Sequence, residues 1–242
     1  MCTVTFIPVK DKFIITSNRD EHISRPYSCE PKETFINGCK LIFPKDPKAG
    51  GTWFAINENG FVGVLLNGAF QKHKTTNNYV MSRGLVLLNI MSSTIPSICL
   101  NEIRLNNIEP FTFVLFEDNQ LLEFRWDGEQ KHFTELNENE CHIWSSATLY
   151  TSEIANRRKA LFTNFINKNE QIESNSIIDF HSYNNNDFQN GFIINRDNGL
   201  KTFSITQAVL SKDKIVLSHS DLLNNKKYSL PILINSMINQ SQ

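Results

Sequence analysis

The chain has 242 residues, of which 40% are hydrophobic and 20% are charged, and its formal net charge is −1. This length and composition suffice for one globular domain with a full core, so we expect a single domain over residues 1–242. The interspersed charges exclude the basic patch of a nucleic-acid-binding protein. The sequence shows no secretory signal and no apolar stretch as long as a transmembrane segment, so we expect a cytoplasmic protein.

The cysteines and histidines are scattered along the chain. Five cysteines are present, an odd number, at positions that fit neither a disulfide framework nor a CxxC site: Cys2, Cys29, Cys39, Cys99 and Cys141. The six histidines do not form a metal-binding H-x-x-x-H pair. The sequence therefore predicts no metal and no cofactor.

The first predicted element is a β-hairpin over residues 2–7 and 12–19, where β-branched and aromatic residues dominate. A turn centred on residues 10–11 places Phe6 opposite Ile15, Val4 opposite Ser17 and Cys2 opposite Arg19. Directly opposed side chains share one face of a sheet and lie about 5 Å apart at Cβ. A slip of one residue would put Cys2 and Arg19 on opposite faces.

Cys2 directly follows Met1, and removal of Met1 would leave a thiol and an α-amine on one residue. The α-amine titrates at about 7.7–8.0 and the thiol at about 8.5, so the amine can act as the base for the thiol. Arg19 beside the sulfur would favour the thiolate and could hold a substrate carboxylate or carbonyl, while Asp20 could orient Arg19 or hydrogen-bond the new amino terminus. Asn18, in the same polar run, is a candidate substrate-binding residue. The alternative interpretation is that residues 18–21 form a solvated turn.

Three motifs together resemble a known family: Met-Cys at the start, Asn-Arg-Asp-Glu at 18–21 and Ala-Gly-Gly-Thr-Trp at 49–53. The resemblance is to the NRDE family, also called the transport-and-Golgi-organisation family, and it is closest over residues 1–70. Members resemble N-terminal-nucleophile hydrolases, notably the cysteine amidohydrolases that cleave bile-salt and penicillin amides. The resemblance implies a four-layer αββα sandwich.

The proline-containing residues 22–48 are expected to be a long irregular segment with one short strand at 40–43. Such a segment forms either a wall or lid over a pocket or a simple surface excursion.

A second hairpin is predicted around Asn59-Gly60, a two-residue turn signal. Centred there, residues 53–58 pair with 61–66, which places Thr52 opposite Asn67. The resemblance implies that Asn67 helps to form an oxyanion hole, a contribution of about 3 kcal/mol to the barrier. The alternative is that Asn67 belongs to an ordinary turn.

The remaining pattern alternates between helical and strand-like segments. Helices are expected at 78–91, after Pro96, at 153–166 and at 176–182; strands are expected at 111–117, 121–126, 131–136, 142–145, 191–194, 202–210 and 214–218. The tail after Ser229 is expected to be peripheral. Hairpins at both ends with helices between them suit an α+β fold in which antiparallel sheets pack face to face.

Two more site residues follow from the resemblance. It implies an asparagine, as a second oxyanion donor, near the position of Ser146; a hydroxyl donates over a shorter reach. It also implies a second active-site arginine, for which Arg157 and Arg158 are candidates, although two basic residues on a helix are more often solvated.

Two functions are compatible with these observations. The first is a cysteine N-terminal-nucleophile amidohydrolase acting on a small-molecule amide, with Cys2, Arg19, Asp20 and Asn67 as catalytic residues. The second is a non-catalytic carrier of haem or another amphiphilic ligand, because relatives in the family are linked with trafficking. The substrate and the oligomeric state do not follow from the sequence.

Overall fold

Two antiparallel β-sheets lie face to face in the computed structural model, which describes residues 3–76, 78–169 and 171–234. Within these residues, one sheet has six strands in the order β10-β1-β2-β11-β12-β13 and the other has seven in the order β3-β4-β5-β6-β7-β8-β9. The strands of the first sheet are β1 (Thr3–Val9), β2 (Lys12–His22), β10 (His142–Ser145), β11 (Leu200–Ser211), β12 (Lys214–Asp221) and β13 (Lys226–Leu233). Those of the second are β3 (Cys29–Ile36), β4 (Cys39–Lys45), β5 (Phe54–Asn57), β6 (Val62–Asn67), β7 (Phe111–Glu117), β8 (Gln120–Trp126) and β9 (Lys131–Leu136).

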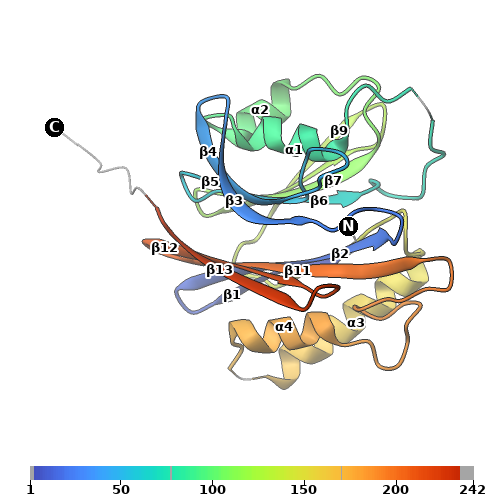
Figure 1. Ribbon diagram of the computed structural model, residues 1–242. Helices are drawn as coiled ribbons and strands as arrows, with labels where there is room; N and C mark the ends of the chain where they lie inside the picture. Colours follow the sequence, from blue (N-terminus) through green and yellow to red (C-terminus); the bar gives the residue numbers. More distant parts are fainter. Residues whose placement is uncertain (1–2, 77, 170, 235–242) are drawn as a thin grey trace.

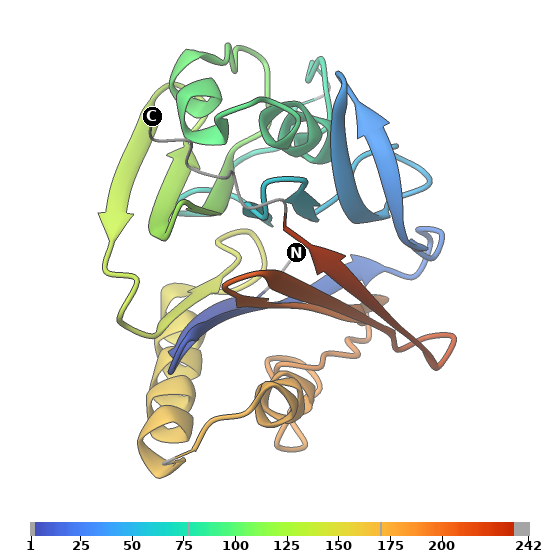
Figure 2. The ribbon, with the colours of Figure 1, turned by 90° about the vertical axis from the view of Figure 1, so that its left-hand side faces the viewer.

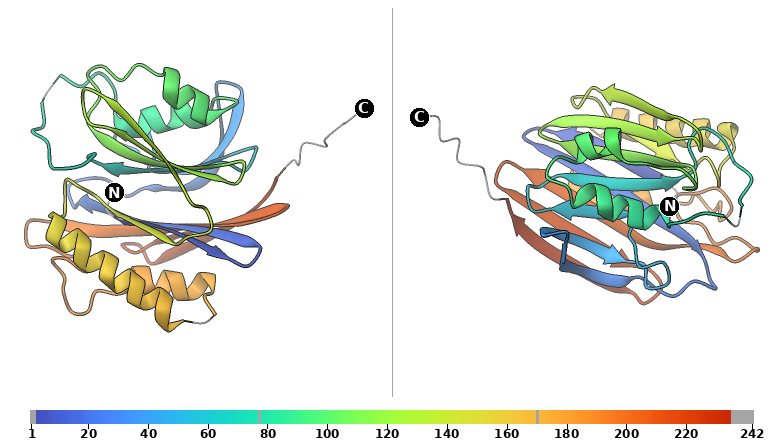
Figure 3. Two further views of the ribbon diagram at one scale, coloured as in Figure 1. Left: turned by 180° about the vertical axis from the view of Figure 1, so that it is seen from behind. Right: turned by 90° about the horizontal axis from the view of Figure 1, so that it is seen from above.

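Helices cover the outer face of each sheet (Figure 1). Helices α1 (Arg83–Met91) and α2 (Pro96–Glu102) pack on the seven-stranded sheet, and α3 (Ser152–Lys168) and α4 (Ser174–Ser182) on the six-stranded sheet. A quarter turn shows the same four layers (Figure 2), and the view from behind shows α3 and α4 below the sheets and α1 and α2 above them (Figure 3, left). The predicted α+β sandwich of αββα layers is confirmed.

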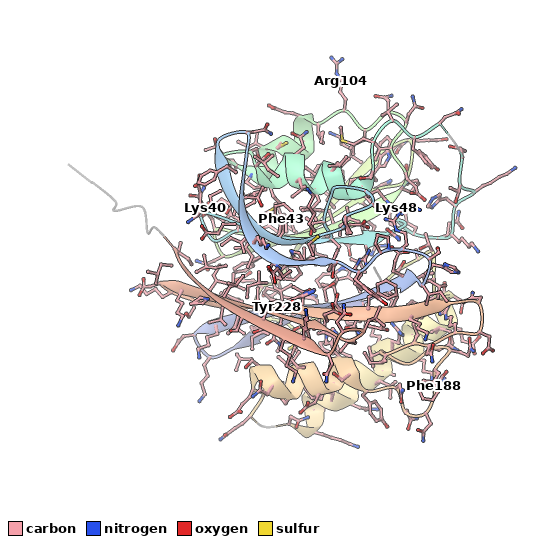
Figure 4. All side chains as sticks on the ribbon, viewed as in Figure 1. Lys40, Phe43, Lys48, Arg104, Phe188 and Tyr228 are labelled. Atoms are coloured by element: carbon pink, nitrogen blue, oxygen red, sulfur yellow. The ribbon has the colours of Figure 1, made fainter. Side chains whose placement is uncertain are left out.

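Three apolar clusters hold the layers together. The central cluster lies between the sheets and includes Val4, Phe6 and Ile15; each outer cluster lies between a sheet and its helices. Side chains fill the space between the two sheets, whereas Arg104 projects from the upper helical layer (Figure 4). Because strands β1 and β2 are covered on both faces, their alternating residues separate into a face toward the other sheet and a face toward α3 and α4.

The register of the first hairpin matches its prediction in the described residues. Phe6 lies opposite Ile15, Val4 opposite Ser17, and Thr3 opposite Asn18. Lys10 takes a positive φ of 51° in the turn. The expected pair of Cys2 with Arg19 involves Cys2, which lies outside the described residues.

The prediction of an irregular segment over residues 22–48 is wrong for residues 29–36, whereas the short strand predicted at 40–43 lies within β4. Strands β3 and β4 form a hairpin at the edge of the seven-stranded sheet. Its turn is Asn37-Gly38, with φ angles of 52° and 81°, as a two-residue turn with positive φ at both positions requires. This Asn-Gly signal was present in the sequence, and it identifies the hairpin.

The predicted register of the second hairpin is wrong by one residue. Ile56 lies opposite Val62 and Phe54 opposite Val64, so the connection is longer than two residues. The Asn57 side chain organises it by accepting hydrogen bonds from the backbone N–H of Asn59 (3.1 Å) and Phe61 (3.0 Å). Consequently Thr52 is not opposite Asn67.

One prediction in the last third of the chain also fails. Residues 191–194 do not form a strand, and the isolated bridge next to them pairs Asn195 with Lys201. The described residues after Ser229 continue β13, which pairs with β12 and lies at the edge of its sheet, a peripheral position as expected. Pro231 is compatible with that strand because β13 lies at the edge of its sheet, where a missing N–H is tolerated.

Candidate functional site

A cavity of about 350 Å³ opens where β2 and β6 meet the start of α1 and the loop after β4. We call it the Arg19 pocket. Its wall is polar, with three arginines and three carboxylates among its residues: Arg19, Glu21, Arg25, Asp46, Ala49, Gly51, Thr52, Trp53, Leu65, Asn67, Ser82, Arg83, Gly84 and Glu109. Two residues predicted for the site, Arg19 and Asn67, are therefore brought together from different sheets.

Arg19 lies on the face of β2 that points toward the other sheet and is only 2% exposed. Its Nη2 is 3.1 Å from Asp46 Oδ2 and 3.6 Å from Glu21 Oε2. The guanidinium stacks over the rings of Trp53 (4.7 Å) and Phe203 (5.4 Å). Burial lowers the pKa of Arg19 against the opposing attraction of the two carboxylates, and the group stays charged because arginine starts far above neutrality.

Asp46 is the carboxylate that binds both Arg19 and Arg25 in the pocket wall, and the sequence did not predict it as a site residue. Its carboxylate accepts hydrogen bonds from Arg19, from Arg25 (2.6 Å) and from the backbone N–H of Lys48 (2.9 Å) and Ala49 (3.1 Å). Burial acts to raise the pKa of Asp46, but these hydrogen bonds and the two arginines outweigh it and hold that pKa below its usual range. The signal was Asp-Pro, which favours a turn closed by the aspartate side chain.

Asn67 ends β6 and lines the pocket beside Leu65. Its backbone carbonyl accepts a hydrogen bond from the Ser146 hydroxyl (2.9 Å), which also lies 3.0 Å from Thr148 Oγ1. Ser146 is 1% exposed and does not line the pocket in the described part of the chain. Its hydroxyl joins the end of β10 to the end of β6, so it fixes the backbone of Asn67 without lining the pocket in the described residues.

Asn18 lies on the opposite face of β2 from Arg19, toward α4. Its Nδ2 donates to the carbonyl oxygens of His181 (2.9 Å) and Phe192 (2.8 Å), and its Oδ1 accepts from His181 Nδ1. His181 Nε2 consequently accepts from the Thr5 hydroxyl (2.8 Å). Complete burial, assisted by the charge of Arg158, lowers the pKa of His181 to about 3, so the imidazole is neutral in the folded protein.

Asp20 is also directed toward the helical layer. It accepts hydrogen bonds from the Thr202 hydroxyl (2.6 Å) and the Tyr150 hydroxyl (3.0 Å). Successive strand residues point to opposite faces of a sheet. Arg19 therefore lies on the face of β2 toward the seven-stranded sheet, where it pairs with Glu21 and Asp46.

Arg158 is buried in that same layer, where it contacts the first described residue of β1. Its guanidinium donates to Thr3 Oγ1 and to the carbonyls of Asn190 (3.1 Å) and Gly191, and it stacks on Tyr150 at 3.7 Å. Arg158 is 1% exposed and lies outside the Arg19 pocket. The structure therefore brings Arg158 to the residue that follows Cys2; Cys2 itself lies outside the described residues.

A second arginine–carboxylate pair completes the pocket wall, and no sequence motif indicated it. Arg83, the first residue of α1, lies 3.0 Å from Glu109 and donates to the carbonyl of Pro110 (3.1 Å). Glu109 also contacts His73 Nε2 at 3.1 Å. The loop of the 49–53 motif supports this wall, because a Cβ on Gly51 would clash with the backbone of Gly84.

Two features are absent from the described residues. No group of three or more histidine, cysteine, aspartate or glutamate side chains there is placed to hold a metal ion. None of the helices in that part of the chain combines the length and apolarity needed to cross a membrane.

Two facing antiparallel sheets between helical layers, with β1 and β2 as interior strands of the six-stranded sheet, define the N-terminal-nucleophile hydrolase-like fold. Two solved structures of variants of conjugated bile acid hydrolase from Clostridium perfringens share it, with TM-scores of 0.56 and 0.55 and 12% identity, covering 95% of this chain and 92% of theirs. The Caenorhabditis elegans ortholog of N-acylethanolamine-hydrolyzing acid amidase gives a TM-score of 0.58 at 10% identity, over 85% of this chain and 92% of its own.

The chain belongs to the family described as Transport and Golgi organisation 2, whose model matches residues 1–226. This result confirms the resemblance seen in the sequence motifs. The search of curated proteins gave no match.

Proposed function

We propose that this protein is a cysteine N-terminal-nucleophile amidohydrolase that cleaves the C–N bond of a small non-peptide amide. The observation that carries the proposal is the convergence of Arg19 and Asn67 from two sheets on one pocket. Val4 and Phe6 face the same inter-sheet space as Arg19, and Cys2 is the next position in that period-two series. The proposal adds the Cys2 thiol, on the basis of its sequence position, to the cation and the amide of this pocket.

In the proposed reaction, Met1 is removed and the α-amine of Cys2 takes the thiol proton. The thiolate attacks the amide carbonyl carbon, and the carbonyl oxygen becomes an oxyanion held by Asn67. The C–N bond then breaks as the ammonium returns its proton to the leaving amine, which leaves a thioester. Water, deprotonated by the same α-amine, hydrolyses the thioester and regenerates the thiol and the acid product.

The protein's contribution in this scheme is electrostatic and positional. Arg19 favours the thiolate, and a donor such as Asn67 is worth about 3 kcal/mol of barrier. Asn18, Asp20 and Arg158 act as positioning residues, because their hydrogen bonds attach β1 and β2 to the helical layer. Ser146 holds Asn67 through its backbone carbonyl.

The names of the structural neighbours support amide chemistry. One is called a conjugated bile acid hydrolase and the other an acid amidase. The cytoplasmic location remains a prediction from the sequence.

The alternative is a carrier of haem or another amphiphile in the same cleft. The charged wall of the Arg19 pocket favours the hydrolase, because sites for amphiphiles are lined mainly by apolar side chains. Titration with haem distinguishes these functions: a Soret shift that is unchanged in Cys2→Ala, together with no amide turnover, would favour the carrier.

The direct test is intact-mass measurement of the purified protein before and after a thiol-directed acylating probe. We expect loss of Met1 and a single acyl adduct that is absent in Cys2→Ala. Cys29→Ala is the matched control, because Cys29 is an exposed thiol outside the pocket, and it should keep the adduct. Retained Met1, or full amidase activity in Cys2→Ala, would overturn the proposal.

A further inference from the structure

We propose that the Arg19 pocket binds a carboxylate of the substrate, between Arg19, Arg83 and the start of α1, so that the preferred amides are monoanions. This inference rests on the proposed amidohydrolase function, since it names the substrate class of the same site.

The pocket wall has unused hydrogen-bond donors. Arg19 Nη1, Arg25 Nε and Trp53 Nε1 are buried and have no hydrogen-bond partner in the described part of the chain. Arg19 and Trp53 are 2% and 3% exposed, so bulk water does not reach them freely. No buried acceptor of the described pocket wall is similarly unpaired. A ligand that satisfies this wall must therefore supply acceptor oxygens.

The carboxylates of the wall are already engaged. Asp46 receives four hydrogen bonds, Glu109 contacts Arg83 and His73, and Glu21 accepts from the His22 N–H while facing Arg19. They are therefore poor partners for a ligand cation. The arginines differ, because a guanidinium has five N–H donors, and Arg83 directs Nη1 to the carbonyl of Pro110 and Nη2 to Glu109.

The start of α1 adds a second source of positive potential. Ser82, Arg83 and Gly84 line the pocket, and α1 has nine residues with no acidic residue in its first turn. Ser82 caps the helix by accepting from the N–H of Leu85, at 3.3 Å. The dipole of a helix places partial positive charge at its first turn, where an anion is stabilised.

The charge balance selects a carboxylate over a phosphate. Three arginines face three carboxylates, so the wall is formally neutral before a ligand binds. Either ligand could use the spare donors. The three carboxylates would repel a phosphate dianion more strongly than a monoanion. We therefore commit to a carboxylate, with inorganic phosphate as an arm of the test.

Binding is measured by calorimetry on full-length Cys2→Ala protein, which separates recognition from turnover. The probes are N-acetylglycine, its uncharged amide N-acetylglycinamide, and inorganic phosphate. We expect N-acetylglycine to bind about tenfold more tightly than the uncharged amide, as charge-assisted hydrogen bonds imply. Equal binding of the two, or tighter binding of phosphate, would overturn the inference.

Two substitutions of opposite sign test the wall. Arg83→Gln should remove the preference for the carboxylate, and Glu109→Gln should increase it, because the first removes positive charge and the second removes negative charge. A general loss of folding would not produce opposite changes. Arg157→Gln is the control, since Arg157 forms its ion pair with Asp187 outside the pocket. If Glu109→Gln leaves the preference unchanged, the inference fails even where Arg83→Gln does not fold.

Failure of the inference and failure of the proposed function give different results. Selective carboxylate binding by Cys2→Ala without any amide turnover by the wild type would leave the subsite standing and remove the hydrolase. Equal turnover of neutral and carboxylate-bearing amides by the wild type, without selective binding, would leave the hydrolase standing and remove the subsite.

Discussion

The two faces of β2 have different environments. Asn18 and Asp20 point toward the helical layer. Asn18 donates two hydrogen bonds there and Asp20 accepts two, all with residues more than a hundred positions away in the sequence. Arg19, between them in sequence, points into a cavity and keeps a buried donor without a partner among the described residues. One face is a closed polar network that fixes the strand, and the other is open to a ligand. In the proposed function, positioning and recognition are thus assigned to neighbouring residues of one strand.

The largest effect should come from removing the network on the helical side. Arg158→Ala leaves the Thr3 hydroxyl and the carbonyls of Asn190 and Gly191 without their donor, at a cost of about 3–5 kcal/mol in the free energy of unfolding. Urea denaturation measures it. Unchanged stability with a raised KM would instead make Arg158 a substrate-binding residue and would break the comparison.

On the pocket side, the main loss should be in activity. Arg19→Met should lower kcat/KM for an amide by about 10²–10³-fold, the range found when one electrostatic donor is removed. Its stability should change less, because Arg25 still pairs with Asp46 at 2.6 Å. Parallel kinetics and denaturation measure both effects. An equal loss of stability in Arg19→Met and Arg158→Ala would argue against two distinct faces.

Each side of the six-stranded sheet buries a histidine, which provides a pH test. Burial lowers the pKa of His181 to about 3 and, despite attraction by Asp221, that of His219 to about 4. Below pH 6.5 the unfolded chain binds protons that the folded chain does not, so each histidine should cost about 2 kcal/mol of stability at pH 5 relative to pH 7.

This loss should be absent above pH 6.5 and should level off below pH 3 to 4, once the folded histidines also bind protons. Urea unfolding at pH 7 and pH 5 measures it. His181→Gln and His219→Gln should each remove one share of the pH dependence. A pH dependence identical to that of the wild type in both variants would contradict the prediction.

The smallest effect concerns the support of Asn67. Ser146→Ala removes the hydrogen bond to the Asn67 carbonyl and should cost about 1 kcal/mol of stability. Activity should fall only by a few fold, since the Ser146 hydroxyl does not line the pocket within the described residues. A loss as large as that of Arg19→Met would mean that Ser146 contacts the reacting oxygen. Ser145→Ala, one position earlier in β10, is the control.

The parts of this structure that could be predicted from sequence are governed by local interactions. The register of the first hairpin follows from a tight turn at residues 10–11, and Asn37-Gly38 would have revealed the hairpin of β3 and β4. The turn at Asn59-Gly60 misled because an earlier side chain, that of Asn57, accepts two backbone N–H groups and lengthens the loop. Two local signals compete in this hairpin, the Asn59-Gly60 turn and the Asn57 side chain. The hydrogen bonds of Asn57 determine the register between β5 and β6.

The candidate site was predictable only where the family resemblance or the register of a hairpin indicated its residues. Arg19 lies in the motif at 18–21 and was also predicted from the register of the first hairpin, Asn67 was predicted from the family resemblance outside those motifs, and the two residues share a pocket. Asp46 carried a turn signal but nothing that linked it to Arg19. Arg83 and Glu109 meet only because α1 packs against the end of the loop before β7, a contact set by the tertiary fold. The side of β2 to which Asn18 points depends likewise on helices far along the chain.

The position of the first hairpin within its sheet has a consequence for biosynthesis. Strands β1 and β2 are synthesised long before their hydrogen-bonded neighbours in the sheet, β10 and β11, which begin at His142 and Leu200. While the ribosome is still making the middle of the chain, the leading hairpin has open edges on both sides, which are prone to mispairing. The edge of β2 that carries Arg19 therefore stays open until β11 is made, and a nascent chain stalled before Leu200 would lack Phe203, one of the two rings on which the Arg19 guanidinium stacks.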